Sequence, residues 1–270
     1  MYYIGVVNRK AIKMQAKEWI RRAVPAAWLV ALVYQVAVTV IPEFIGRLMP
    51  YQNELNELFA MYSPEDAELI LYRMMDIFSS TGGYLMLFVS IALSLYSTVV
   101  SYGYTGYSLG VIRGENPGCG ELFSRFYMAG KIILAMVLEV IYVFLWSLLF
   151  VIPGLVAAYR YRMVTYCLLD DPDCSVNEAF RRSKLLMDGR KWELFKLDVS
   201  FWPWSFAASL LAGSPYQILS GRLADCLYYI IAIAINLFLI PYRGFTYASW
   251  YEAIRPKTGG EQEPQNQPYV

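Results

Sequence analysis

The chain has 270 residues, of which 57% are hydrophobic and only 17% are charged. This is more apolar surface than a soluble domain of this size can bury, so the composition is typical of an integral membrane protein. The formal net charge of +1 gives no field that would attract nucleic acid.

The amino acids that most often carry catalysis or hold metals are scarce. The chain contains no histidine, and its four cysteines (Cys119, Cys167, Cys174 and Cys226) are far apart. Histidine general bases, histidine-ligated haem and Cys/His zinc sites are therefore excluded. We expect free structural thiols, no cofactor, no metal site and no enzymatic activity.

Residues 1–23 are predicted to form a basic amphipathic helix on the cytoplasmic side. Asn8 is a natural N-cap, and Ile12, Ala16 and Ile20 follow at helical spacing, opposite a face rich in lysine and arginine. Such a helix can lie on an anionic leaflet, or its charges can simply set the topology of the following span. The two interpretations are compatible.

Residues 24–255 are predicted to form an all-α, polytopic transmembrane helix bundle with about six spans. A helix needs about 20 residues to cross the hydrocarbon core. The apolar segments place the spans at about 24–41, 84–102, 132–152, 155–169, 198–213 and 226–247.

The connecting segments also have predicted structure. The external loop 42–83 contains a helix that begins near Ser63-Pro64-Glu65 and is stopped by Thr81-Gly82-Gly83. A capping box, Ser175 to Glu178, begins a cytoplasmic helix over 175–197. The tail, 256–270, is rich in Gly, Pro, Gln and Glu and is predicted to be disordered.

The number of spans depends on one hinge, Pro153-Gly154. If 132–169 were a single crossing, the six lysines and arginines between Arg181 and Lys196 would lie outside the cell. A hairpin that turns at Pro153-Gly154 returns them to the cytoplasm, where basic residues concentrate. A re-entrant hairpin that dips into the membrane without crossing satisfies the same rule, so both arrangements stay open.

A glycine stripe at the end of the second span favours close helix packing. Gly103, Gly106 and Gly110 recur at intervals of three and four residues. Missing side chains let a neighbouring backbone approach, which is how membrane helices often associate. The alternative is that the glycines let a ligand approach.

A few polar and hinge residues within the spans are the candidate functional residues. An isolated charge at this depth is costly, so such residues pair, face water or line a pathway. Glu139 and Arg243 are predicted to lie at the same depth in the membrane. Glu139 and Arg162 differ in depth by nearly the full reach of an arginine side chain. Two interpretations of these charged residues stay open. They form an internal ion pair, or they line a polar pathway or a site for an anionic lipid headgroup. The candidates are Glu139, Pro153, Gly154, Arg160, Arg162, Pro241 and Arg243.

Several segments of the second half together resemble a known bacterial membrane family, domain of unknown function 975. They are Leu145 to Gly154, Tyr159 to Met163, Asp171-Pro172, Glu178-Ala179, Ser183 to Gly189, Pro241-Tyr242 and Trp250-Tyr251. The resemblance implies a multi-pass protein of the bacterial cytoplasmic membrane. It implies no activity, because the family has no assigned catalytic or binding residues.

The leading hypothesis is a non-enzymatic protein of the cytoplasmic membrane with both termini in the cytoplasm. It would act through membrane lipids, including anionic ones, or through a membrane protein partner or a second copy of itself. The alternative is a small transporter or channel component whose polar site lies near Glu139 and the intramembrane arginines.

Overall fold

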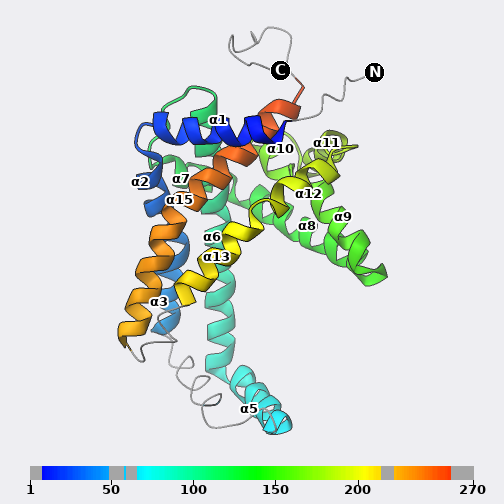
Figure 1. The fold of residues 1–270 in the computed structure, drawn as a ribbon. Helices are drawn as coiled ribbons and strands as arrows, with labels where there is room; N and C mark the ends of the chain where they lie inside the picture. Colours follow the sequence, from blue (N-terminus) through cyan, green and yellow to red (C-terminus); the bar gives the residue numbers. More distant parts are fainter. Residues whose placement is uncertain (1–7, 49–57, 59–65, 214–221, 257–270) are drawn as a thin grey trace.

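The structure is a computed structural model that describes residues 8–48, 58, 66–213 and 222–256. Every element of regular secondary structure within these residues is a helix. The all-α prediction is therefore confirmed for this part of the chain. Residues 1–7, the predicted helix start at Ser63 to Glu65, and residues 257–270 of the predicted tail lie outside it. The helices, labelled as in Figure 1, are α1 (Arg9–Arg22), α2 (Ala27–Gln35), η1 (Val36–Val40), α3 (Ile41–Arg47), α5 (Ala67–Ser79), α6 (Thr81–Ile112), α7 (Glu121–Ser124), η3 (Arg125–Met128), α8 (Ala129–Leu149), α9 (Val151–Tyr161), α10 (Val164–Asp170), α11 (Val176–Leu186), α12 (Lys191–Val199), α13 (Trp202–Gly213) and α15 (Arg222–Ile254).

Among the described residues, four continuous helical segments are long and apolar enough to cross a membrane. They contain 20, 32, 29 and 29 residues, which at 1.5 Å per residue gives each at least about 30 Å. They are Ala27–Gly46, Thr81–Ile112, Glu121–Leu149 and Cys226–Ile254.

The other two predicted spans, 155–169 and 198–213, are not formed by helices of spanning length. α9 has 11 residues and α13 has 12, so each provides only about 16 to 18 Å of helix. A turn at Arg162 and Met163 separates α9 from α10. The structure therefore supports four long apolar helices and does not confirm six spans.

The chain reverses at Phe150 and not at Pro153-Gly154 as predicted. Phe150 is extended (φ −162°, ψ 157°) between α8 and α9. Pro153 lies in the first turn of α9, where a missing backbone N–H costs little. A Cβ on Gly154 would lie 2.0 Å from the Ser147 hydroxyl, so this glycine lets α8 and α9 pack closely.

Three other predicted boundaries differ. Thr81 to Gly83 begin α6 and do not end α5, because the Ser80 hydroxyl accepts a hydrogen bond from the Gly83 N–H at 3.1 Å. The segment 175–197 forms two helices, α11 and α12, separated at Gly189, whose positive φ of 73° ends the first. α15 continues through Pro241, so this proline is buried in an unbroken helix.

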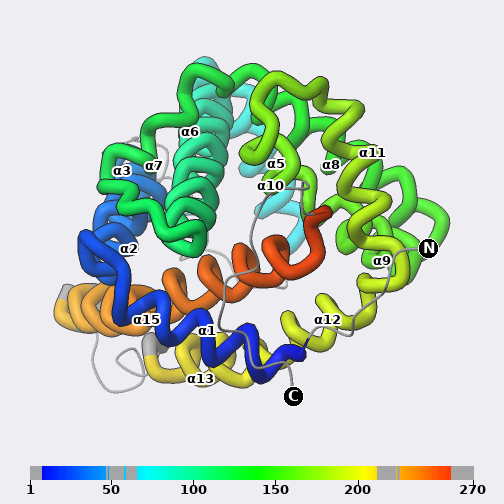
Figure 2. Tube along the Cα trace, turned by 90° about the horizontal axis from the view of Figure 1, so that it is seen from above, coloured from blue at the N-terminus to red at the C-terminus, as the bar shows by residue number. Residues whose placement is uncertain are grey.

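α1 lies across the end of the bundle where α15 finishes, and the two helices pack together (Figure 1). Ile12 and Ala16 are buried there, so the apolar face of α1 contacts protein and its basic face remains outside. In the perpendicular view, α6, α8, α9, α12 and α15 follow one another around the molecule and α10 lies inside (Figure 2).

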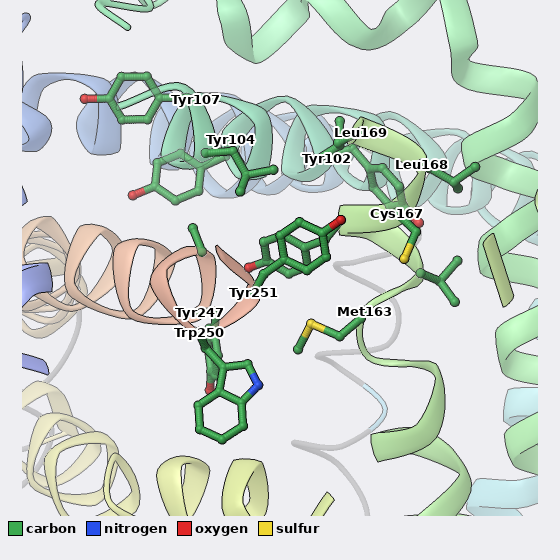
Figure 3. Close-up of a cluster of buried hydrophobic side chains, with 14 of the residues drawn as sticks. Tyr102, Tyr104, Tyr107, Met163, Cys167, Leu168, Leu169, Tyr247, Trp250 and Tyr251 are labelled. Carbon is green, nitrogen blue, oxygen red and sulfur yellow. The ribbon is translucent and has the colours of Figure 1, made fainter. Parts of the chain in front are cut away.

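The core at this end is rich in aromatic side chains from α6 and α15 (Figure 3). Trp250 and Tyr107 are fully buried, and Tyr166 of α10 stacks on Tyr251 with ring centroids 5.0 Å apart. α6 and α15 can approach because Gly244 has no side chain; a Cβ there would lie 2.8 Å from the Tyr104 ring.

The glycine stripe of α6 faces the chain segment that directly follows it. Gly114, with φ of +81°, reverses the chain so that residues 115–125 run back along α6. A Cβ on Gly103 would lie 2.1 Å from the Leu122 carbonyl oxygen, and one on Gly110 would lie 2.8 Å from the Glu115 carboxylate.

We expect Gly103→Ala to lower the free energy of unfolding by about 1 to 3 kcal/mol, because the new methyl group meets backbone that cannot rotate away. Gly130→Ala is the matched control: nothing lies within 4 Å of a Cβ at this helical glycine. It should be neutral or stabilising by up to about 1 kcal/mol. Thermal unfolding in detergent measures both, and equal effects would contradict the proposed close contact.

Candidate functional site

Asp198, in the last turn of α12, accepts hydrogen bonds from two tyrosines of other helices. The Tyr159 hydroxyl of α9 donates to Oδ2 at 2.9 Å, and the Tyr247 hydroxyl of α15 donates to Oδ1 at 2.5 Å. Both carboxylate oxygens therefore have a donor. Hydrogen bonds to a charged acceptor are stronger than neutral ones, so Asp198 ties three helices together.

Arg162 lies beside this carboxylate, at the break between α9 and α10. Its guanidinium carbon is 5.3 Å from the centroid of the Tyr247 ring. It interacts electrostatically with Asp198 and with Glu139 of α8, but forms no ion pair with any described residue. We call Glu139, Tyr159, Arg162, Asp198 and Tyr247 the Asp198 cluster.

The structure brings some of the predicted polar residues together and separates others. Glu139 is half-buried and interacts electrostatically with Arg162, and it forms no ion pair with Arg243, the residue that matches it in depth. Arg243 is exposed and lies above the Phe201 ring, 5.9 Å from its centroid. An equal depth in the membrane does not bring Glu139 and Arg243 together, because the two side chains leave their helices in different directions.

Arg160 lies outside the cluster, although it is only two residues from Arg162. Its backbone carbonyl accepts a hydrogen bond from the Ser183 hydroxyl at 2.9 Å, which joins α9 to α11. Its side chain forms no ion pair with the described part of the chain.

A second polar network joins the ends of α6, α10 and α15. The Arg113 guanidinium pairs with Asp170 and, at 2.7 Å, with Glu252. The Tyr251 hydroxyl donates to Asp170 at 2.6 Å, and Arg255 pairs with Glu252 at 2.5 Å. These contacts fix the ends of three helices in one layer.

The acidic turn that begins at Asp170 is also held by ion pairs. Asp171 accepts from the Arg182 guanidinium at 2.9 Å, and Arg182 also contacts Glu178 at 3.1 Å. Two arginine partners, Arg181 and Arg182, lower the pKa of Glu178 to about 2. No group of three or more potential metal ligands occurs among the described residues.

Two glycines of the predicted stripe line a polar cavity of about 210 Å³ beside α6. A Cβ on Gly106 would lie 3.2 Å from both the Arg125 guanidinium and the Glu121 carboxylate. Glycine here therefore leaves room for charged side chains. The cavity is lined by Gly106, Leu109, Gly110, Arg113, Glu115, Pro117, Glu121, Arg125 and Leu169.

The chemistry available to the Asp198 cluster is binding and charge compensation. Both Asp198 oxygens accept from tyrosines, and Arg162 lies between the charges of Asp198 and Glu139 without an ion pair to either. Sequence reasoning missed Asp198 and its two tyrosines. One signal could have found Asp198, since this carboxylate stands at the first residue of a predicted apolar span.

Residues 134–258, which contain every member of the Asp198 cluster, match the family described as Protein of unknown function (DUF975). The match covers slightly less than half of the chain, and over this segment the chain is similar to that family. The predicted resemblance is thereby confirmed, and the cluster is a feature of the DUF975 region of the chain. Comparison with curated proteins and with solved structures gave no match.

We expect Tyr247→Phe and Tyr159→Phe each to destabilise the protein by about 1.5 to 3 kcal/mol, because each removes a hydrogen bond to a charged acceptor. Tyr127→Phe is the control, since this tyrosine is 70% exposed. Unfolding in detergent, followed by tryptophan fluorescence, measures the difference. If all three variants matched the wild type, the hydrogen bonds to Asp198 would contribute nothing to stability.

Proposed function

We propose that the protein is a multi-pass protein of the bacterial cytoplasmic membrane with both termini in the cytoplasm. We propose further that it is not an enzyme and that it acts through contacts with anionic lipids or with a protein partner, including a second copy of itself. One observation carries this proposal. The exposed apolar side chains and the polar networks occupy different parts of the structure.

Large apolar side chains cover the outward faces of the long helices. Phe88 of α6 is 70% exposed, Leu85 55% and Phe144 of α8 60%. Soluble monomers rarely expose contiguous apolar surface of this extent. In a bilayer these side chains meet lipid tails, so their exposure carries no cost.

Charge distribution supports the cytoplasmic assignment of both ends. α1 carries six basic residues and one acidic residue, and α11 and α12 add further lysines and arginines. These helices lie at the end of the bundle where α15 finishes (Figure 1). Because basic residues concentrate on the cytoplasmic side, this end is proposed to face the cytoplasm. Contact between α1 and α15 puts both ends of the described chain on one side.

The tip of the α8 and α9 hairpin supports insertion of this pair into the bilayer. Phe150, Val151 and Ile152 are 75%, 82% and 75% exposed. We propose six crossings, with α9 and α13 as the short return segments. A re-entrant α8 and α9 hairpin is the alternative consistent with the length of α9.

Cysteine labelling tests the topology. In a variant with the four native cysteines replaced by alanine, Tyr72→Cys of α5 should react with a membrane-impermeant maleimide in intact cells. Met14→Cys of α1 should react only after the cells are opened. Both native side chains are well exposed, at 69% and 67%. Reaction of Met14→Cys in intact cells would overturn the proposed orientation.

The same background distinguishes a crossing from a re-entrant hairpin. If the hairpin crosses, Val151→Cys should react in intact cells, as Tyr72→Cys does. If Val151→Cys reacts neither in intact cells nor in opened cells, the tip of the hairpin lies inside the hydrocarbon core. That result would reduce the number of crossings and leave the membrane assignment unchanged.

A small transporter or channel component is the second candidate, favoured by the Asp198 cluster alone. Arg162 is exposed yet surrounded by groups from several helices, as expected for a side chain that meets a passing ion. α15 is unbroken at Pro241, so this predicted hinge residue does not interrupt the helix.

A double-mutant cycle with Glu139→Gln and Arg162→Gln separates a pathway from a structural pair. Because Glu139 and Arg162 form no ion pair, we expect a coupling free energy of about 0.5 kcal/mol or less. Both charges would then be available to a ligand. A coupling above about 1 kcal/mol in detergent unfolding would assign them to structure and count against the second candidate.

A further inference from the structure

Three cationic side chains gather on two aromatic rings where α1 crosses α15. The Lys13 ammonium of α1 lies 4.4 Å from the centroid of the Phe201 ring, and the Arg243 guanidinium lies 5.9 Å from the same centroid. The Lys17 ammonium lies 5.9 Å from the centroid of the Tyr242 ring. The two rings meet edge to face, 5.4 Å apart. We call these five residues the Phe201 patch.

Within the described part of the chain, no carboxylate pairs with the three cations of the patch. Lys13, Lys17 and Arg243 form no ion pair with any described residue, and the one acid of α1, Glu18, pairs with Arg22 instead. Asp198, three residues before Phe201, has its two oxygens occupied by tyrosine hydroxyls. The patch therefore gathers three cations that are not ion-paired with any described residue.

Lys13 and Lys17 of the patch also repel each other. Burial, followed by repulsion from Arg9 and Lys17, lowers the pKa of Lys13. Aromatic faces attract cations through their quadrupole, which holds the side chains in place without neutralising them. An anion that entered the patch would relieve this repulsion.

The patch lies at a membrane boundary in the proposed topology. Arg243 is the first charged residue after the apolar run 226–242 of α15, and Lys13 and Lys17 precede the first span. Trp202 and Trp204, at the start of α13, are 62% and 61% exposed, as in the aromatic belts of membrane interfaces. Lipid phosphate groups occupy this level.

We propose that Lys13, Lys17 and Arg243 form a binding site for the phosphate group of an anionic phospholipid. Arginine matches phosphate oxygens with two parallel donors, and the lysines add charge from the opposite helix. A bound phosphate would also join α1 to α15. The inference rests on the proposed membrane function and names a site for its lipid contacts.

The test follows thermal unfolding of the full chain in a zwitterionic detergent during titration with lipid. Phosphatidylglycerol should raise the unfolding temperature, whereas phosphatidylcholine should not. Lys13→Gln with Lys17→Gln should weaken the apparent affinity for phosphatidylglycerol at least about tenfold, and Arg243→Gln should do the same. Arg243→Lys should retain part of the response.

The matched control is Lys10→Gln with Arg21→Gln, which removes the same charge from exposed positions of α1. This variant should keep the wild-type affinity. An equal loss in control and patch variants would overturn the proposal in favour of general surface charge. Stabilisation by inorganic phosphate equal to that by phosphatidylglycerol would overturn the lipid and leave free phosphate as the ligand.

Failure of this inference is separable from failure of the proposed function. If the topology experiment places α1 in the cytoplasm but the patch variants bind phosphatidylglycerol like the wild type, only the site is wrong. If Arg243→Gln fails to fold, the Lys13 and Lys17 double variant decides alone, because both side chains belong to a peripheral helix.

Discussion

The cost of placing ionised side chains in hydrocarbon is the constraint on which the rest of this structure depends. Charged groups of the described chain are concentrated at one end, where Arg113, Asp170 and Glu252 connect three helix ends. Asp198 is held by two tyrosines, and Arg162 lies over a tyrosine ring.

Close packing of α6 against α15 places these groups. Gly244 removes the side chain that would separate the helices, and the aromatic residues on either side then interlock. Tyr247 lies one turn beyond Gly244, so the same packing points its hydroxyl at Asp198. The polar cluster is thus a consequence of how two apolar helices fit together.

The two candidate sites differ in the chemistry that they can support. The Asp198 cluster contains both signs of charge within the bundle, which suits charge compensation or passage of an ion. The Phe201 patch contains only positive charge beside aromatic rings, which suits a phosphate. A protein that acts through lipid contacts would use the second site, and the first would then serve to hold α9, α12 and α15 together.

Composition and hydropathy by themselves determined that the chain is helical and apolar enough for a membrane, because long runs of apolar residues leave few other structures. Local signals were also sufficient for the Asn8 cap of α1 and the Ser175 cap of α11, since a cap is made within three residues. Only the tertiary structure decided the turn at Phe150, the partner of Glu139 and the position of Arg243 over Phe201. These depend on the directions in which side chains from distant helices leave their axes, and spacing along the chain does not contain that information.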